Sequence, residues 1–92
     1  MVEMRCLITG KVQGVRYRDY VQASATELGV VGLVENLPDG SVLVVAQGMP
    51  DLLKDFVEYL HEGSLLSRVD GVAIEWGTAR KLYDDFSIIM RA

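Results

Sequence analysis

The spacing of apolar residues predicts a strand followed by a helix in the first third of the chain. Val2, Met4, Cys6 and Ile8 fall at every second position, which is typical of a strand over residues 2–9 with one buried face. Residues 17–28 then follow the helical period, and Gly29 ends the predicted helix. The residues that share the buried face of this helix are Tyr17, Val21, Ser24, Ala25 and Leu28.

Two further β runs, residues 30–37 and 41–47, are separated by Pro38-Asp39-Gly40. Residues of these types between two β runs favour a tight turn, so the runs are predicted to form a hairpin. Residues 42–46 are apolar without interruption, which indicates a central strand of the sheet.

The second half of the chain predicts one more helix and two more strands. Gly48-Met49-Pro50-Asp51 is typical of a helix start, and Gly63 ends this helix. Its buried stripe consists of Leu53, Phe56, Val57 and Leu60. A fourth strand has Val72, Ile74 and Trp76 at alternate positions, and a short fifth strand has Phe86, Ile88 and Met90.

The predicted order is βαββαβ with a short extra C-terminal strand. With both helices crossing over on one side, this order indicates an α+β fold, the ferredoxin-like sandwich, in which a mostly antiparallel sheet carries two helices on one face. No linker or repeat interrupts the chain, so residues 1–92 are predicted to form one domain. Such a fold supports many activities and does not by itself assign one.

Composition and charge narrow the classes of partner. Half of the residues are hydrophobic, which argues against disorder, and no apolar run approaches the ~18 residues of a membrane span. No signal-peptide pattern precedes the first strand, so we expect a cytoplasmic protein without a membrane partner. The formal net charge is −4 and the central strands lack aromatic residues, so nucleic acid is not an expected partner.

Neither the single cysteine nor the single histidine is expected to take part in the chemistry. Cys6, the only cysteine, falls inside the first strand pattern and is expected to be a small core residue. His61, the only histidine, is expected on the surface of the second helix. No cluster has metal-ligand spacing, so neither a metal nor a cofactor is expected.

The segment Gly10–Arg18 carries the strongest chemical signal. It joins the first strand to the first helix, and it contains two glycines and three of the nine Lys and Arg residues. A glycine-bearing turn before a helix gathers unpaired backbone N–H groups, and the helix dipole adds attraction for an anion. Arg18 opposes that dipole, so its presence indicates a use, and its guanidinium can hold a phosphoryl group through two hydrogen bonds. The side chains of Lys11 and Arg16 are expected to face solvent.

Two residues near this segment have structural interpretations as well. Tyr17 is expected to be a core residue that holds the loop against the sheet. Asn36 ends the second strand, where it either caps the hairpin turn or faces a site, and the pattern alone does not decide between these roles.

The segment Gly10–Arg18 resembles, position for position, the acylphosphatase signature Gly-x-Val-Gln-Gly-Val-x-Phe/Tyr-Arg. A second block is similar to the same family at Gly32, Val34, Asn36, Gly40, Val42 and Gly48. The element order and the length also fit. The resemblance implies hydrolysis of acyl phosphates, which are mixed anhydrides of a carboxylic acid and phosphate, without a metal ion.

By this resemblance Arg18 binds the phosphoryl group and Asn36 orients the attacking water. The residues expected to contribute to phosphate binding are Gln13, Gly14, Val15, Arg16, Tyr17 and Arg18. The expected ligands are a small acyl phosphate and, as a product-like ligand, inorganic phosphate or sulfate. We also expect a monomer.

The chain departs from the family pattern at three places. Leu33 stands where the family usually has an aromatic residue, and Glu35 precedes Asn36 where a basic or neutral residue is common. Alternation places Glu35 on the opposite sheet face from Asn36, so activity is expected to persist. Gly63-Ser64 stands where Gly-Pro often follows the second helix.

Two interpretations stay open beside these expectations. Leu65 and Leu66 are expected to tuck under a helix, with a self-association patch as the alternative. The alternative function is a non-catalytic anion-binding or interaction module of the same fold, for which Asn36 would not be needed.

Overall fold

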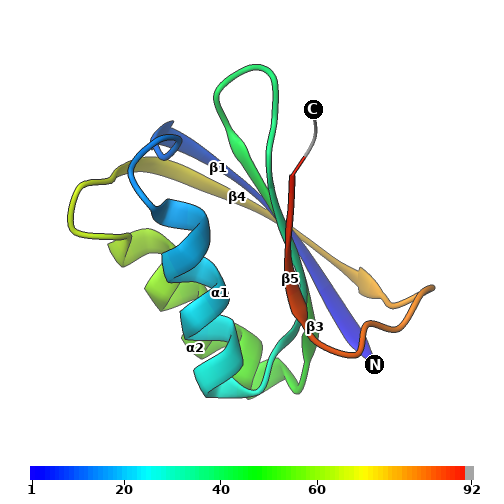
Figure 1. The fold of residues 1–92 in the computed structure, drawn as a ribbon. Coiled ribbons are helices and arrows are strands. Elements are labelled where there is room, and N and C mark those ends of the chain that lie inside the picture. Colours follow the sequence, from blue (N-terminus) through cyan, green and yellow to red (C-terminus); the bar gives the residue numbers. More distant parts are fainter. Residues whose placement is uncertain (91–92) are drawn as a thin grey trace.

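The computed structural model describes residues 1–90 as one sheet covered on one face by two helices (Figure 1). The elements in chain order are β1 (Val2–Lys11), α1 (Tyr17–Leu28), β2 (Val31–Asn36), β3 (Val42–Gly48), α2 (Pro50–Glu62), β4 (Arg68–Thr78) and β5 (Phe86–Ile89). The ferredoxin-like arrangement predicted from the sequence is therefore confirmed.

The sheet has the strand order β4-β1-β3-β2-β5, so β3 lies at its centre as predicted. β1 pairs antiparallel with β3 and β4, and β2 pairs antiparallel with β3. The fifth strand adds to the edge beside β2, and this is the one parallel pairing among the described residues 1–90. In a typical row across the sheet, Cys6 lies between Val44 of β3 and Ile74 of β4.

The core lies between the sheet and the helices. The alternate β1 residues Met4, Cys6 and Ile8 are fully buried, as their spacing predicts. Phe56 of α2 meets Phe86 of β5 edge to face, with ring centroids 5.8 Å apart.

Both helices end where their glycines predict. Gly29 has a left-handed backbone, with φ 75°, and Val30 N–H donates to Ala25 O at 2.9 Å. At the end of α2, Gly63 N–H donates to Tyr59 O at 3.0 Å. Within residues 1–90, neither helix is long and apolar enough to cross a membrane.

One close approach of backbones depends on glycine in β2. Gly32 has φ 145°, and a Cβ at this position would collide with the carbonyl oxygen of Val45 on β3. The second motif block therefore contains at least one glycine with a packing role.

The edges of the sheet are more exposed than the sequence pattern indicates. Ile74 and Trp76 lie on the helix-facing side of β4, yet they are 36% and 48% exposed because β4 is an edge strand. β4 also begins at Arg68, earlier than the alternating residues indicate. Met90 lies beyond the end of β5 and is exposed.

The expectation that Leu65 and Leu66 tuck under a helix is wrong. Their side chains are 98% and 66% exposed. Ser67 donates to Ser64 O through its backbone N–H (3.1 Å) and its hydroxyl (2.9 Å). This short turn closes on itself and leaves the two leucines at its tip, in solvent.

Candidate functional site

The turn between β1 and α1, residues 12–16, is held by two valine side chains that enter the core; we call it the cradle loop. Val12 and Val15 are 1% and 5% exposed. Gly14 and Arg16 have left-handed backbones, with φ 73° and 62°. Turns of this kind bring backbone N–H groups to one concave side before a helix, which favours anion binding.

Gln13 ties the cradle loop to the β2–β3 hairpin. Its Nε2 donates to Leu37 O at 2.8 Å and to Ser41 O at 2.9 Å. The hairpin itself is braced by the carboxylate of Asp39, which accepts from Ser41 N–H at 2.9 Å and from the Ser41 hydroxyl. These hydrogen bonds lower the pKa of Asp39. Gln13 therefore fixes the loop against the chain that directly follows Asn36.

The C-terminal end of α2 holds the cradle loop from another direction. Ser64 Oγ donates to Val15 O at 3.0 Å. Because carbonyl and N–H point in opposite directions across a trans peptide, this bond also fixes the direction of the Arg16 N–H. Ser64 is the residue at which the chain departs from the Gly-Pro pattern, so a hydrogen bond occupies this position instead.

Tyr17 supports the start of α1 beside the loop. Its ring is 1% exposed, and its hydroxyl donates to Leu60 O of α2 at 2.8 Å. Burial, and the neighbouring Tyr20 to a smaller extent, raise the pKa of Tyr17, so the hydroxyl remains a donor. The predicted core position of Tyr17 is confirmed, but its hydroxyl is fixed by α2 rather than by the sheet.

Arg18 and Asn36 line the same cavity, although 18 positions of sequence separate them. The cavity has a volume of about 410 Å³ and lies at the cradle loop. Its lining residues are Val12, Gly14, Arg16, Tyr17, Arg18, Asp19, Asn36, Ile88 and Met90. Asn36 reaches it because alternation along β2 places Asn36 on the same side as the buried Val34.

The amide oxygen of Asn36 is buried without a hydrogen-bond partner among residues 1–90. A buried polar atom without a partner is costly, and a ligand or water in the adjoining cavity can satisfy it. The turn-capping role that the sequence left open is thus not what occupies this oxygen. Asn36 is available to a molecule in the cavity.

The cavity is electrostatically suited to an anion. Arg16 and Arg18 both line it, and neither forms an ion pair with the described residues. Arg16 is exposed, as predicted, while Arg18 is half-buried. Asp19 also lines the cavity from the first turn of α1, where a carboxylate favours the helix dipole.

The other candidate residues lie away from this cavity. Cys6 is fully buried, and burial raises its pKa to about 12, so its thiol is unreactive, as expected. His61 and Lys11 are exposed, also as expected. Within residues 1–90, no group of three or more His, Cys, Asp or Glu residues is placed to hold a metal ion.

Sequence reasoning missed three contributions to the site. Ile88 and Met90 line the cavity because β5 pairs with β2, and Ser64 holds the loop from a segment 49 residues away. The β5 pattern and the Gly63-Ser64 departure were visible signals, but neither indicated proximity to the cradle loop.

A scan against protein-family models matches residues 4–88 to the family described as acylphosphatase. The curated acylphosphatase of Thermus thermophilus is 47% identical over 77 residues, which cover 84% of this chain and 88% of the relative. The acylphosphatase of Marinobacter nauticus is 48% identical over 80 residues, covering 87% of each chain.

Solved structures of acylphosphatases are also similar to this chain, both in fold and in sequence. The crystal structure of acylphosphatase from Bacillus subtilis superimposes with a TM-score of 0.95 and 33% identity, covering 98% of this chain and 100% of that one. A structure of full-length HypF in a phosphate- and nucleotide-bound form matches with a TM-score of 0.86 and 25% identity. That match covers 98% of this chain but 12% of HypF.

Proposed function

The chain belongs to the acylphosphatase family, and on that premise we propose that Arg18 binds the phosphoryl group of an acyl phosphate while Asn36 orients the attacking water. As an acylphosphatase, the protein hydrolyses acyl phosphates to a carboxylate and inorganic phosphate. The observation that carries the proposed roles is the single cavity of about 410 Å³ that both residues line.

Arg18 and the cradle loop supply the positive groups that the phosphoryl group needs. The guanidinium offers a fork of N–H donors, and the proposed further donors are backbone N–H groups between Gln13 and Arg18. Of these residues, Gly14, Arg16, Tyr17 and Arg18 line the cavity. The transition state of phosphoryl transfer spreads negative charge over three equatorial oxygens. Donors that are already fixed in position stabilise that charge without reorganising. Val12, Val15 and the bonds from Gln13 and Ser64 keep these donors in position.

Asn36 is suited to positioning a water rather than to removing its proton. Its amide is neutral, and its buried oxygen can accept a hydrogen bond from the water. The water oxygen forms a bond to phosphorus as the bond from phosphorus to the acyl oxygen breaks. The electron pair leaves with the carboxylate, and the water proton passes to a phosphate oxygen. Because a carboxylate is a good leaving group, positioning is the main requirement.

We further propose that hydrolysis needs no metal ion, because Arg18 and backbone N–H groups supply the positive charge. We also propose that the protein acts as a monomer of a single domain. Inorganic phosphate or sulfate is the proposed product-like ligand. We also propose that the protein is cytoplasmic and that it has no nucleic-acid partner.

The test is steady-state hydrolysis of benzoyl phosphate by the parent chain, Arg18→Ala and Asn36→Ala. Loss of one preorganised donor typically lowers turnover by about 10²–10³, and we expect at least that loss for each variant. Arg68→Ala is the matched control, since Arg68 is an exposed arginine paired with Asp70 on β4 and should keep full activity. Circular dichroism verifies that each variant is folded.

Three results would overturn the proposal. A folded Arg18→Ala variant with parent-like turnover would remove Arg18 from the site. Loss of activity in EDTA, restored by Mg²⁺, would contradict the metal-free reaction. Phosphate binding without turnover of any acyl phosphate would instead support the non-catalytic module.

A further inference from the structure

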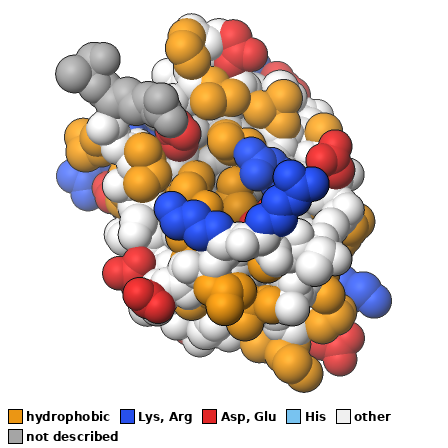
Figure 2. Space-filling view, turned by 90° about the vertical axis from the view of Figure 1, so that its right-hand side faces the viewer, with side chains coloured by type: hydrophobic (Ala, Val, Ile, Leu, Met, Phe, Trp, Pro, Cys, Tyr) orange, Lys and Arg blue, Asp and Glu red, His pale blue; other side chains and the backbone are white. Residues whose placement is uncertain are grey.

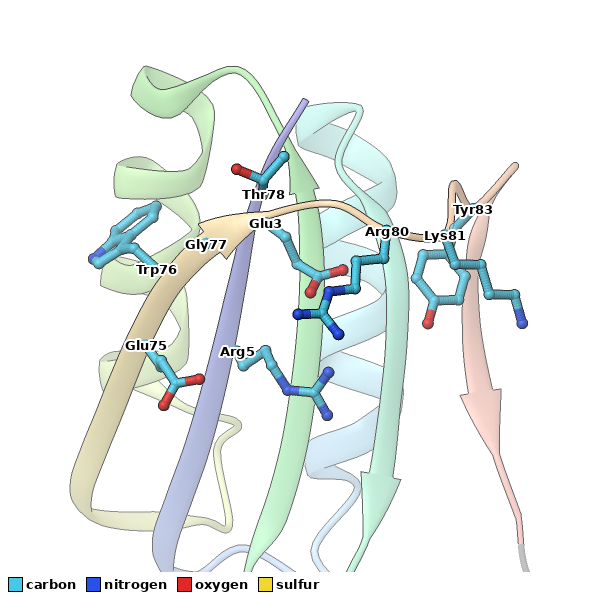
Figure 3. Close-up of a pocket in the computed structure, with 9 residues that line it drawn as sticks. All are labelled: Glu3, Arg5, Glu75, Trp76, Gly77, Thr78, Arg80, Lys81 and Tyr83. Carbon is cyan, nitrogen blue, oxygen red and sulfur yellow. The ribbon is translucent and has the colours of Figure 1, made fainter.

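A second hollow lies on the sheet face that the helices leave uncovered (Figure 3). Its volume is about 450 Å³, within the range of about 300–1,000 Å³ that is typical of small-molecule pockets. The residues that carry the argument are Glu3, Arg5, Glu75, Arg80, Lys81 and Tyr83. None of them lines the cavity of Arg18 and Asn36, so the two sites are separate.

The hollow gathers positive charge on an acidic protein. Although the net charge is −4, Arg5, Arg80 and Lys81 line this one space. Figure 2 shows Lys and Arg side chains grouped near the middle of this face. Neither Arg5 nor Arg80 forms an ion pair within the described residues 1–90. Glu3 and Glu75 line the same hollow and offset part of this charge, so the three cations leave a local excess of one positive charge. A bound anion would reduce the repulsion between the cations.

A fully buried glutamine fixes the loop that supplies two of these cations. Gln47 of β3 donates through Nε2 to Lys81 O and, at 3.1 Å, to Glu3 Oε1. Its Oε1 accepts from Tyr83 N–H at 3.2 Å. All the hydrogen-bonding groups of the Gln47 amide therefore serve to hold this wall of the hollow, and the site is formed before any ligand enters.

The orientation of the side chains indicates what the hollow can hold. Figure 3 shows the guanidinium groups of Arg5 and Arg80 directed over the sheet toward the same space, with Tyr83 on the far side from Glu75. Lys81 Nζ lies 5.4 Å from the centroid of the Tyr83 ring. The hollow thus combines a pair of guanidinium forks with one aromatic wall.

We propose that this hollow binds a phosphate monoester, with the phosphate held between Arg5 and Arg80 and the organic part against Tyr83. Two guanidinium groups match a dianion with three terminal oxygens better than a singly charged carboxylate. The volume of about 450 Å³ is larger than inorganic phosphate needs. One water molecule, with a single heavy atom, takes about 30 Å³, and phosphate has only five heavy atoms. Glu3 and Glu75 also line the hollow, and their negative charge disfavours ligands with charge beyond the phosphate.

The test is an NMR titration of the full chain carrying Arg18→Ala, which weakens binding at the first cavity. The probes are adenosine monophosphate, glycerol phosphate and inorganic phosphate. We expect a monoester to shift the amide signals of Arg5, Gly77 and residues 80–83 in a saturable way. Adding Arg80→Gln should weaken this binding about tenfold, the loss expected for one charge-assisted hydrogen-bonding group.

The control is Arg68→Gln, which removes the same charge from an exposed, paired arginine on β4 and should leave the affinity unchanged. Equal effects of the Arg68 and Arg80 changes would reduce the binding to overall charge and overturn the proposal. Shifts confined to residues 13–18, or inorganic phosphate binding as tightly as both monoesters, would also overturn it. These outcomes leave the hydrolysis assay at the first cavity unaffected.

Discussion

Replacing Gln13 with alanine is expected to slow hydrolysis by loosening the cradle loop from the strand end that carries Asn36. Gln13 donates to Leu37 O at 2.8 Å and to Ser41 O at 2.9 Å. Leu37 directly follows Asn36, so these bonds set the position of the amide that we propose to orient the water, relative to Arg18.

The magnitude follows from two lost hydrogen bonds. Each contributes about 0.5–1.5 kcal/mol, so the free energy of unfolding should fall by about 1–3 kcal/mol. The lower part of that range is favoured because both acceptors keep a partner. Leu37 O still accepts from Gly40 N–H at 3.1 Å, and Ser41 O still accepts from Leu37 N–H at 2.9 Å. A displacement of about 1 Å at a reacting centre can cost ~10²-fold, so we expect kcat to fall roughly tenfold to a hundredfold.

The assay measures kcat and KM for benzoyl phosphate together with urea unfolding. Gln22→Ala is the matched control, because Gln22 on α1 makes one such bond, to Phe86 O at 3.0 Å, which joins α1 to β5 and not to the cradle loop. It should lose about 0.5–1.5 kcal/mol of stability and keep its kcat. If Gln13→Ala is destabilised as predicted yet turns over like the parent, Gln13 does not position the site.

Ser64→Ala removes the hydroxyl that holds the Val15 carbonyl, so inhibition by inorganic phosphate should weaken about threefold to tenfold; an unchanged inhibition constant would contradict this role. Gly32→Ala should lower the free energy of unfolding by at least about 1–3 kcal/mol, since its Cβ would meet a carbonyl of β3. Gly77→Ala, with open space around it, should unfold like the parent, and equal urea midpoints for the two variants would refute the steric argument. Burial raises the pKa of Cys6 to about 12, so a thiol reagent at pH 8 should label it only after unfolding. Because an unfolded cysteine titrates near ~8.5, the stability linked to this thiol is complete below that pH and is lost as the pH rises toward the folded value. Rapid labelling of the native protein would show that the thiol is accessible.

The sequence predicts the central elements well because their burial is regular. Alternation identifies β1, and the uninterrupted apolar run identifies β3 as the central strand. The proximity of Arg18 and Asn36 cannot be predicted in the same way, because contact across the fold leaves no local pattern in the sequence. The residues alone allow Asn36 either to cap a turn or to face a site, and only the family resemblance favours the site.

Predictions failed or were silent where loops and edges decide the outcome. Hydrophobicity suggested that Leu65 and Leu66 are covered, but hydrogen bonds within the turn set the direction of that loop. The parallel pairing of β5 with β2 has no short turn to announce it, so its contribution to the cavity could not be predicted. Gln47 reads as an ordinary strand residue, and only the folded chain shows that it holds the loop around Lys81.

The side chains that fix the cradle loop all reach across the sequence. Gln13 bonds to residues 24 and 28 positions away, Tyr17 to one 43 positions away, and Ser64 to one 49 positions away. No short fragment can therefore assemble this catalytic geometry, since the hairpin and the end of α2 must both be docked first. The return of hydrolysis during refolding would report the completion of the last long-range contacts, whereas spectroscopic helix signals would recover earlier.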